Sequence, residues 1–153
     1  MDASDFKILK GIGYMNFIDK AFTQKLTGKD FLQAMAGIYS EPEIYQVLDR
    51  YPAFVKDVII IIDYDTELQM EGLDEIIQGN LSDRYFEIVN ALERCGEKEE
   101  VLVLKKAREL YDNDEQQYAE KYSDLYNSLA LNHDEEGFWN LVIKYINCNL
   151  NKM

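Results

Sequence analysis

The chain has 153 residues, 47% of them hydrophobic, which is enough to bury the core of one domain spanning 1–153 without disulfides or metals. It carries 29 acidic residues against 16 basic ones, so its net charge is −13. This charge argues against direct binding of nucleic acid or of anionic membranes, because both interactions need clustered basic side chains. Composition therefore favours a basic protein surface as the partner.

Other features of the sequence favour the cytoplasm. Residues 1–5 lack the cationic and apolar parts of a signal peptide. The longest apolar run, 58–62, is too short to cross a bilayer. Cys95 and Cys148 form no CxxC pair and are too few for a disulfide scaffold, so we expect free thiols in a reducing compartment.

Apolar residues recur at helical spacing along most of the chain. In chain order, the first such segment covers 14–26, and Gly28 is expected to end that helix. A second, shorter helix is expected over 30–39, with Asp30 as the residue that caps its first turn.

The next segment begins with a capping signal. Ser40 stands three residues before Glu43, as a capping box requires, and Pro42 suits the first turn of a helix. Ser40 is therefore expected to cap this helix. The helix is expected to end near Pro52, because the residue before a proline disfavours helical backbone angles.

Residues 53–70 contain the one ambiguous segment. The β-branched run 58–62 has high strand propensity. No second segment is available to pair with it, however, and an isolated strand would leave its backbone groups without hydrogen-bond partners. The apolar residues around the run also follow helical spacing, so we predict a central helix that is covered on several sides.

The remaining segments complete an all-helical prediction. One helix is expected over 81–95, ending at Gly96, and another over 101–112. The polar stretch 113–131 is expected to form one or two shorter helices, and Asp134 to cap a closing helix. The sequence therefore predicts an all-α fold, a single compact domain of about seven to nine helices.

Few residues offer catalytic chemistry. His133, the single histidine, precedes three acids, but adjacent residues at a helix start point in different directions, so a solvated helix N-terminus is the simpler interpretation. Cys95 and Cys148 lack a neighbouring base. Residues 11–13 lack the lysine of a phosphate loop, and the acids from Asp63 onward lack the glycine and glutamate of a calcium loop. We predict no catalytic residue, no cofactor and no metal site.

The acidic residues are unevenly distributed. Residues 1–60 hold eight acids and seven bases, whereas 61–153 hold 21 acids and nine bases. Two stretches, 63–75 and 109–120, contain acids and no base. A negative face could steer and orient a basic partner, although the same acidity could serve solubility alone. The candidate partner-binding residues are Asp63, Asp65, Glu67, Glu71, Asp74, Glu75, Asp112, Asp114 and Glu115.

Several motifs resemble the DNA-mimic protein 19 family. In that family a helix runs into a motif of the type Glu-Val-Asn-Asn-Gly-Gly-Phe. Here residues 67–73 read Glu-Leu-Gln-Met-Glu-Gly-Leu, so the glutamate and the second glycine match and both asparagines are replaced. The family's Ala-Leu-x-x-x-Gly helix end is matched by residues 91–96, and residues 122–126 and 145–146 resemble its C-terminal pattern.

This resemblance covers about 51–149 and implies an all-helical fold. It also implies a protein that imitates the charge of DNA and so occupies the DNA-binding surface of a regulator. We therefore expect a non-enzymatic, cytoplasmic interaction protein of bacterial type. Two alternatives stay open: an immunity-type protein that neutralises a basic toxin, and a small metal-dependent or hydrolytic enzyme that uses His133 and nearby carboxylates.

Overall fold

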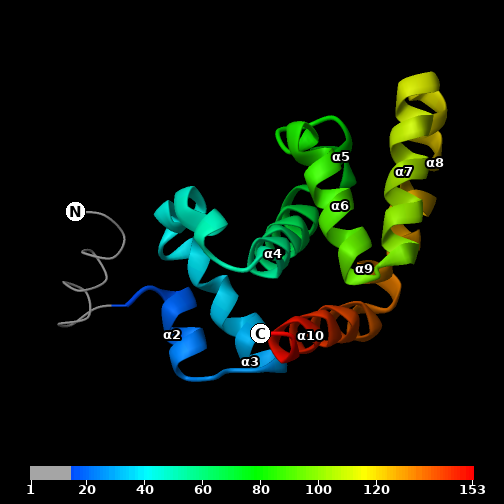
Figure 1. Cartoon of the computed structure of the whole chain (residues 1–153). Coiled ribbons are helices and arrows are strands. Elements are labelled where there is room, and N and C mark those ends of the chain that lie inside the picture. The colour runs from blue at the N-terminus through cyan, green and yellow to red at the C-terminus, as the bar shows by residue number, and fades with distance from the viewer. Residues whose placement is uncertain (1–14) are drawn as a thin grey trace.

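The structure is a computed structural model whose described residues are 15–153, and within them the chain forms nine α-helices, three 3-10 helices and no strand (Figure 1). The all-α prediction is confirmed. The expectations for residues 1–5, 11–13 and Tyr14 lie outside this range. The α-helices are α2 (Phe17–Thr23), α3 (Gly28–Met35), α4 (Ala53–Glu71), α5 (Leu73–Ile77), α6 (Tyr85–Cys95), α7 (Lys98–Asn113), α8 (Glu115–Ser128), α9 (Ala130–His133) and α10 (Glu135–Asn151). The 3-10 helices are η1 (Ala36–Tyr39), η2 (Pro42–Arg50) and η3 (Ser82–Arg84).

Helix α4 lies at the centre of the arrangement (Figure 1). It packs against α3, α5, α6 and α10, and also against η1 and η2. Helices α7 and α8 are joined by Asp114 alone and lie side by side as a hairpin at one edge of the molecule (Figure 1). This hairpin reaches the rest of the fold through contacts of α7 with α5, α6 and α9 and of α8 with α9 and α5. None of the helices within 15–153 is both long and apolar enough to span a bilayer.

The predicted central helix is confirmed as α4. Residues 58–61 are at most 1% exposed, and Ile62 is 9% exposed. Burial on several sides explains why this β-branched run is helical. The free energy gained by packing these apolar side chains exceeds the cost of placing β-branched residues in a helix, which is less than about 0.7 kcal/mol per residue.

Two cap predictions near the start of the chain are wrong. Helix α2 stops at Thr23, so Gly28 does not end it but instead begins α3, with a φ of 50°. The Gly28 N–H donates to Asn147 Oδ1 of α10 at 2.8 Å, which holds the start of α3 on the closing helix. Thr27 takes the cap position, and Asp30 lies in the first turn of α3. A contact distant in sequence therefore sets this helix start.

Ser40 is not a helix cap either. The 3-10 helix η2 starts at Pro42, as predicted, but Glu41 occupies the position before it, and no side chain caps the first turn. Ser40 instead follows the end of η1, where its N–H donates to the Gly37 carbonyl at 2.9 Å. The end of η2 before Pro52 is confirmed.

The helix ends in the second part of the chain follow the sequence signals closely. Gly96 ends α6 in the left-handed conformation, with a φ of 88°. The stretch 113–131 forms two helices, α8 and α9, as predicted. Asp134 caps α10, because its side chain accepts a hydrogen bond from the Gly137 N–H at 3.1 Å.

A buried ion pair ties α4 to α6 and α10. Asp57 is 3% exposed and accepts two hydrogen bonds from the Arg94 guanidinium, at 2.9 and 2.7 Å. The Tyr145 hydroxyl donates a third, at 2.6 Å. The hydrogen bond from Arg94 stabilises the charged guanidinium and raises its pKa. Three helices therefore meet on one satisfied carboxylate.

A second buried group consists of the carboxylates of Glu97 and Glu100, and no cation among residues 15–153 forms an ion pair with either of them. Glu100 is fully buried and accepts hydrogen bonds from the Tyr64 hydroxyl at 2.9 Å and from the Ala130 N–H at 2.5 Å. Glu97 is 2% exposed, and among residues 15–153 its Oε2 has no hydrogen-bond partner. Burial, followed by the charges of Glu100 and Asp134, raises the pKa of Glu97 to about 8.

Gly72 separates α4 from α5 and requires a backbone that only glycine adopts easily. Its φ is 85° and its ψ −178°, and a Cβ at this position would lie 2.6 Å from the Tyr122 hydroxyl oxygen. We expect Gly72→Ala to lower the free energy of unfolding by about 2 kcal/mol, because strained backbone and steric contact add. Urea unfolding measures this change.

Gly96→Ala is the matched control for this prediction. Gly96 also has a positive φ, but no atom lies within 4 Å of a Cβ placed there. Its substitution should therefore show only the left-handed backbone cost of about 1 kcal/mol. Equal effects at Gly72 and Gly96 would contradict the role assigned to the Tyr122 contact.

Candidate acidic interaction site

The structure distributes the nine predicted acidic residues among separate neighbourhoods. The predicted common face along 63–75 is interrupted, because α4 ends at Glu71 and the chain turns at Gly72 before α5. Asp74 and Glu75 therefore leave the axis of α4. The acids therefore lie in separate neighbourhoods of the fold.

Asp63 and Glu67 lie one turn apart on the side of α4 that faces Tyr39 of η1. The Tyr39 hydroxyl donates to Asp63 Oδ1 at 2.8 Å, and Arg84 Nη1 lies 3.6 Å from Asp63 Oδ2. Burial raises the pKa of Asp63, although both partners lower it in part. Burial and the charges of both acids raise the pKa of Tyr39 to about 12. The Asp63 carboxylate is thus already bound by Tyr39 and Arg84 within the fold.

Asp65 lies near the start of α10, away from Tyr39. Burial raises the pKa of Asp65, and the negative charge of Glu135 raises it further. No ion pair joins either carboxylate to a cation among residues 15–153. Asp65 therefore belongs to a different surface from Asp63, although a single residue separates them in sequence.

A contact between α5 and α8 brings the two base-free stretches together. The Tyr118 hydroxyl of α8 donates to Asp74 Oδ1 of α5 at 2.5 Å. One turn along α8, the Tyr122 hydroxyl accepts from the Leu73 N–H at 2.9 Å. These tyrosines border a groove of about 450 Å³ that has Asp74 and Glu115 in its lining. Acids from both stretches thus face one groove.

Three further predicted acids do not line this groove, and one of them, Asp112, lines a different groove between α6 and α7. Asp112 and Asp114 flank the turn between α7 and α8, and Glu71 is exposed at the end of α4. Asp112 lies 3.4 Å from Arg108 in an exposed ion pair, and Asp114 accepts the Gln117 N–H at 3.1 Å as the cap of α8. We call the acids at the end of α4, on α5 and around the α7–α8 turn the acidic end: Glu71, Asp74, Asp112, Asp114 and Glu115.

Glu75 does not join the acidic end. Its carboxylate Oε1 accepts the Asn80 N–H at 2.9 Å and so closes the turn that follows α5. Of the nine predicted residues, two therefore line the α5–α8 groove, Asp74 and Glu115, and the other three of the acidic end lie outside its lining. The other four serve local contacts or lie along the middle of α4.

The sequence predicted no binding role for the tyrosines that build the groove. Tyr111 packs edge-on against Tyr118, whose ring packs edge-on against Tyr122 with a centroid distance of 5.9 Å. Tyr122 stacks in turn on Tyr126. Burial and the hydrogen bond to Asp74 raise the pKa of Tyr118, so this hydroxyl stays a donor. The i, i+4 spacing of tyrosines in 118–126 is the signal that could have identified them.

The candidate catalytic groups have ordinary structural surroundings. His133 Nε2 lies 2.6 Å from Glu99 Oε1 in an exposed contact. Cys95 is buried, and burial raises the pKa of its thiol to about 12, which disfavours the nucleophilic thiolate. Cys148 is exposed as a free thiol. Within 15–153, no three His, Cys, Asp or Glu side chains are grouped so that they could hold a metal ion.

Fold and site together define a class: an all-helical acidic protein in which tyrosines of one helix join two base-free acidic stretches around a groove. The chain belongs to the DMP19-like protein family, whose model matches residues 49–149. This match confirms the resemblance that the motifs over 51–149 indicated. The chain has no significant match among the curated proteins and none among the solved structures.

Proposed function

We propose that this protein is a DNA-mimic-type interaction protein whose acidic end occupies the basic, DNA-binding surface of a partner protein. The observation that carries this proposal is the hydrogen bond between Tyr118 and Asp74, because it fixes two base-free acidic stretches beside one groove. Membership of the DMP19-like protein family supports the same function.

The physical basis is charge. A DNA-binding surface is rich in Lys and Arg, since most of its affinity comes from contacts to phosphates. Carboxylates that are held close together by the fold offer such a surface negative charges without an ordering cost. Their main effect is on the rate of association, which electrostatic steering can raise by about 10- to 1,000-fold.

The test compares two variants with the same change in charge. The first neutralises the acidic end by Asp74→Asn, Asp112→Asn and Glu115→Gln. The second makes the same types of substitution at exposed acids elsewhere, by Asp30→Asn, Asp49→Asn and Glu43→Gln. Both variants should fold, because these side chains are exposed or keep an oxygen acceptor.

A partner is captured from lysate of the source cells at low salt, and surface plasmon resonance then measures its association with each variant. We expect the association rate constant to fall at least about tenfold at low ionic strength for the acidic-end variant only. The difference should shrink as salt rises, because exposed charges are screened beyond about 8–10 Å. The protein should also displace DNA from the partner.

Equal association rates for the two variants would show that the acidity serves solubility alone. Capture of a basic toxin, with loss of its activity in the complex, would instead assign the immunity-type function. Retention of the partner's DNA binding in the complex would contradict the DNA-mimic function directly.

A further inference from the structure

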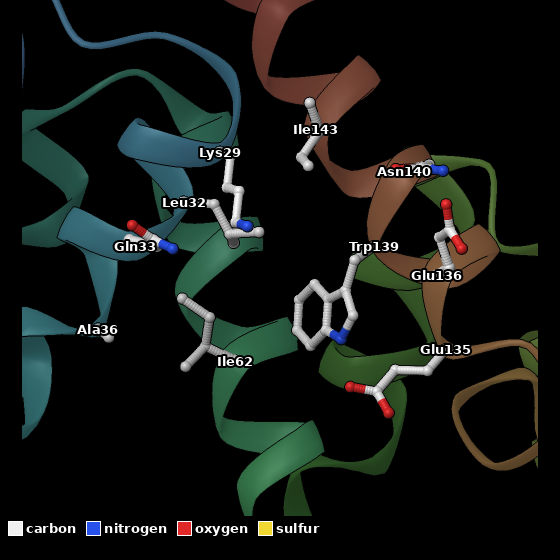
Figure 2. Close-up of a pocket in the computed structure, with 10 residues that line it drawn as sticks. All are labelled: Lys29, Leu32, Gln33, Ala36, Ile62, Glu135, Glu136, Trp139, Asn140 and Ile143. Atoms are coloured by element: carbon white, nitrogen blue, oxygen red, sulfur yellow. The ribbon is translucent and has the colours of Figure 1, made fainter.

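A second groove lies on a different part of the molecule, between α3, α4 and α10, and has a volume of about 590 Å³. Figure 2 shows the Trp139 indole extending from α10 into this groove toward Ile62 of α4. Leu32 of α3 and Ile143 of α10 line it as well. These side chains give the groove apolar walls from three helices.

One end of this groove carries carboxylates that form no ion pair within residues 15–153. Glu135 lines the groove at the start of α10, and Figure 2 shows its carboxylate near the Trp139 ring. Asp65 follows Ile62 by three residues on α4, so it continues the face of α4 that lines the groove. Burial raises the pKa of the half-buried Asp65, and repulsion by the negative charge of Glu135 raises it further, whereas a hydrogen bond with Gln69 lowers it in part.

A cation with an apolar stem would relieve this repulsion. Among residues 15–153, neither Asp65 nor Glu135 forms an ion pair, and the lysine in the lining, Lys29, comes from α3. An arginine suits the site, because its planar guanidinium binds carboxylates through two hydrogen bonds and stacks on an indole face. A volume of about 590 Å³ holds one such side chain and an apolar neighbour.

We propose that the groove between α3, α4 and α10 binds a basic peptide segment of a partner protein. The segment inserts one apolar side chain between Leu32 and Trp139 and places an arginine between Asp65 and Glu135. This site goes beyond the function proposed for the acidic end, since it lies on a different part of the molecule and needs no DNA-binding partner for its test.

Trp139 provides the measurement, because it is the single tryptophan of the chain. The probe is a blocked, alanine-based helical peptide with one leucine and one arginine four residues apart. The control peptide replaces the arginine by neutral citrulline. We expect the arginine peptide to give a saturable change in Trp139 emission with the full chain and to bind at least about tenfold more tightly than the citrulline peptide.

Two protein variants test the placement of the cation. Asp65→Asn combined with Glu135→Gln should weaken the arginine peptide at least about tenfold, whereas Glu109→Gln with Asp124→Asn, exposed acids of α7 and α8, should leave its affinity unchanged. Calorimetry confirms the dissociation constants, and circular dichroism confirms that each variant is folded.

Several results would overturn the proposal. One is the absence of a saturable response to the arginine peptide, and another is equal weakening by both variants, which would reveal an effect of net charge only. A shift of Trp139 emission on Leu9→Asp without peptide binding would assign the groove to residues 1–14 instead. Dependence of the emission on protein concentration would assign it to a second copy. None of these results affects the test of the acidic end.

Discussion

The protein should be more stable at pH 5 than at pH 8, by about 3 kcal/mol in the free energy of unfolding. The main cause is Glu97, which is 2% exposed, has an unpaired Oε2, and has its pKa raised from 4.5 to about 8 by burial and by the charges of Glu100 and Asp134. Most acidic proteins with paired carboxylates behave in the opposite way.

The direction follows from proton binding. Between pH 4.5 and about 8, Glu97 holds a proton in the folded chain and has lost it in the unfolded chain. The folded state therefore binds more protons, and raising the pH through this window favours unfolding. The stability that Glu97 contributes is complete below pH 4.5 and is lost as the pH approaches 8. The raised pKa values of Asp65 and Glu100 act in the same direction.

Urea unfolding at several pH values measures this effect, and Glu97→Gln isolates its source. Glutamine keeps the shape and the hydrogen-bonding capacity of the protonated acid but does not titrate. This variant should exceed the unmodified protein in stability at pH 8 and lose most of the pH dependence. Glu109→Gln, an exposed acid of α7, should keep the full dependence. A steeper rise of stability toward pH 8, or an unchanged slope in Glu97→Gln, would contradict the assignment.

The second large effect concerns the ion pair between Asp57 and Arg94. Replacing Arg94 by methionine should lower the free energy of unfolding by about 3 kcal/mol, because it leaves a buried carboxylate with only the Tyr145 hydroxyl as partner. The side chain of Arg94 is 54% exposed, so water can reach part of the vacated position. This places the effect at the lower end of the range for buried ion pairs.

Two further variants separate charge from geometry at this ion pair. Arg94→Lys keeps the positive charge but loses the paired hydrogen bonds, so it should lose about 1 kcal/mol. Adding Asp57→Asn to Arg94→Met should recover part of the loss, because the buried group is then neutral. Denaturant unfolding measures all three. A loss in the double variant at least as large as that of Arg94→Met alone would contradict this interpretation.

The sequence by itself determined the class of fold and the position of most helices. Helical spacing and the absence of a pairing segment predicted α4 through the β-branched run 58–62, and the structure confirms it. Gly96 and Asp134 marked helix ends correctly, since these signals act within a single turn of backbone. The family was also visible in local motifs, and its model matches nearly the same residues, 49–149.

Tertiary structure decided what local patterns could not. The start of α3 at Gly28 depends on Asn147, a residue 119 positions away, so no cap signal near Gly28 could reveal it. Glu97 and Glu100 are buried because α7 packs between α6 and α9, and no pattern in the local sequence predicts this burial.

The arrangement of the candidate acidic site could not be predicted from local patterns either. Helical periodicity orders the acids along one helix, but it says nothing about which helices meet. Gly72 turns the chain away from the axis of α4, and Tyr118 then fixes Asp74 beside α8, where Glu115 lines the same groove. The composition determined that the protein is acidic. Only the packing of α5 on the α7–α8 hairpin decided which carboxylates stand together, because that depends on contacts between residues far apart in the chain.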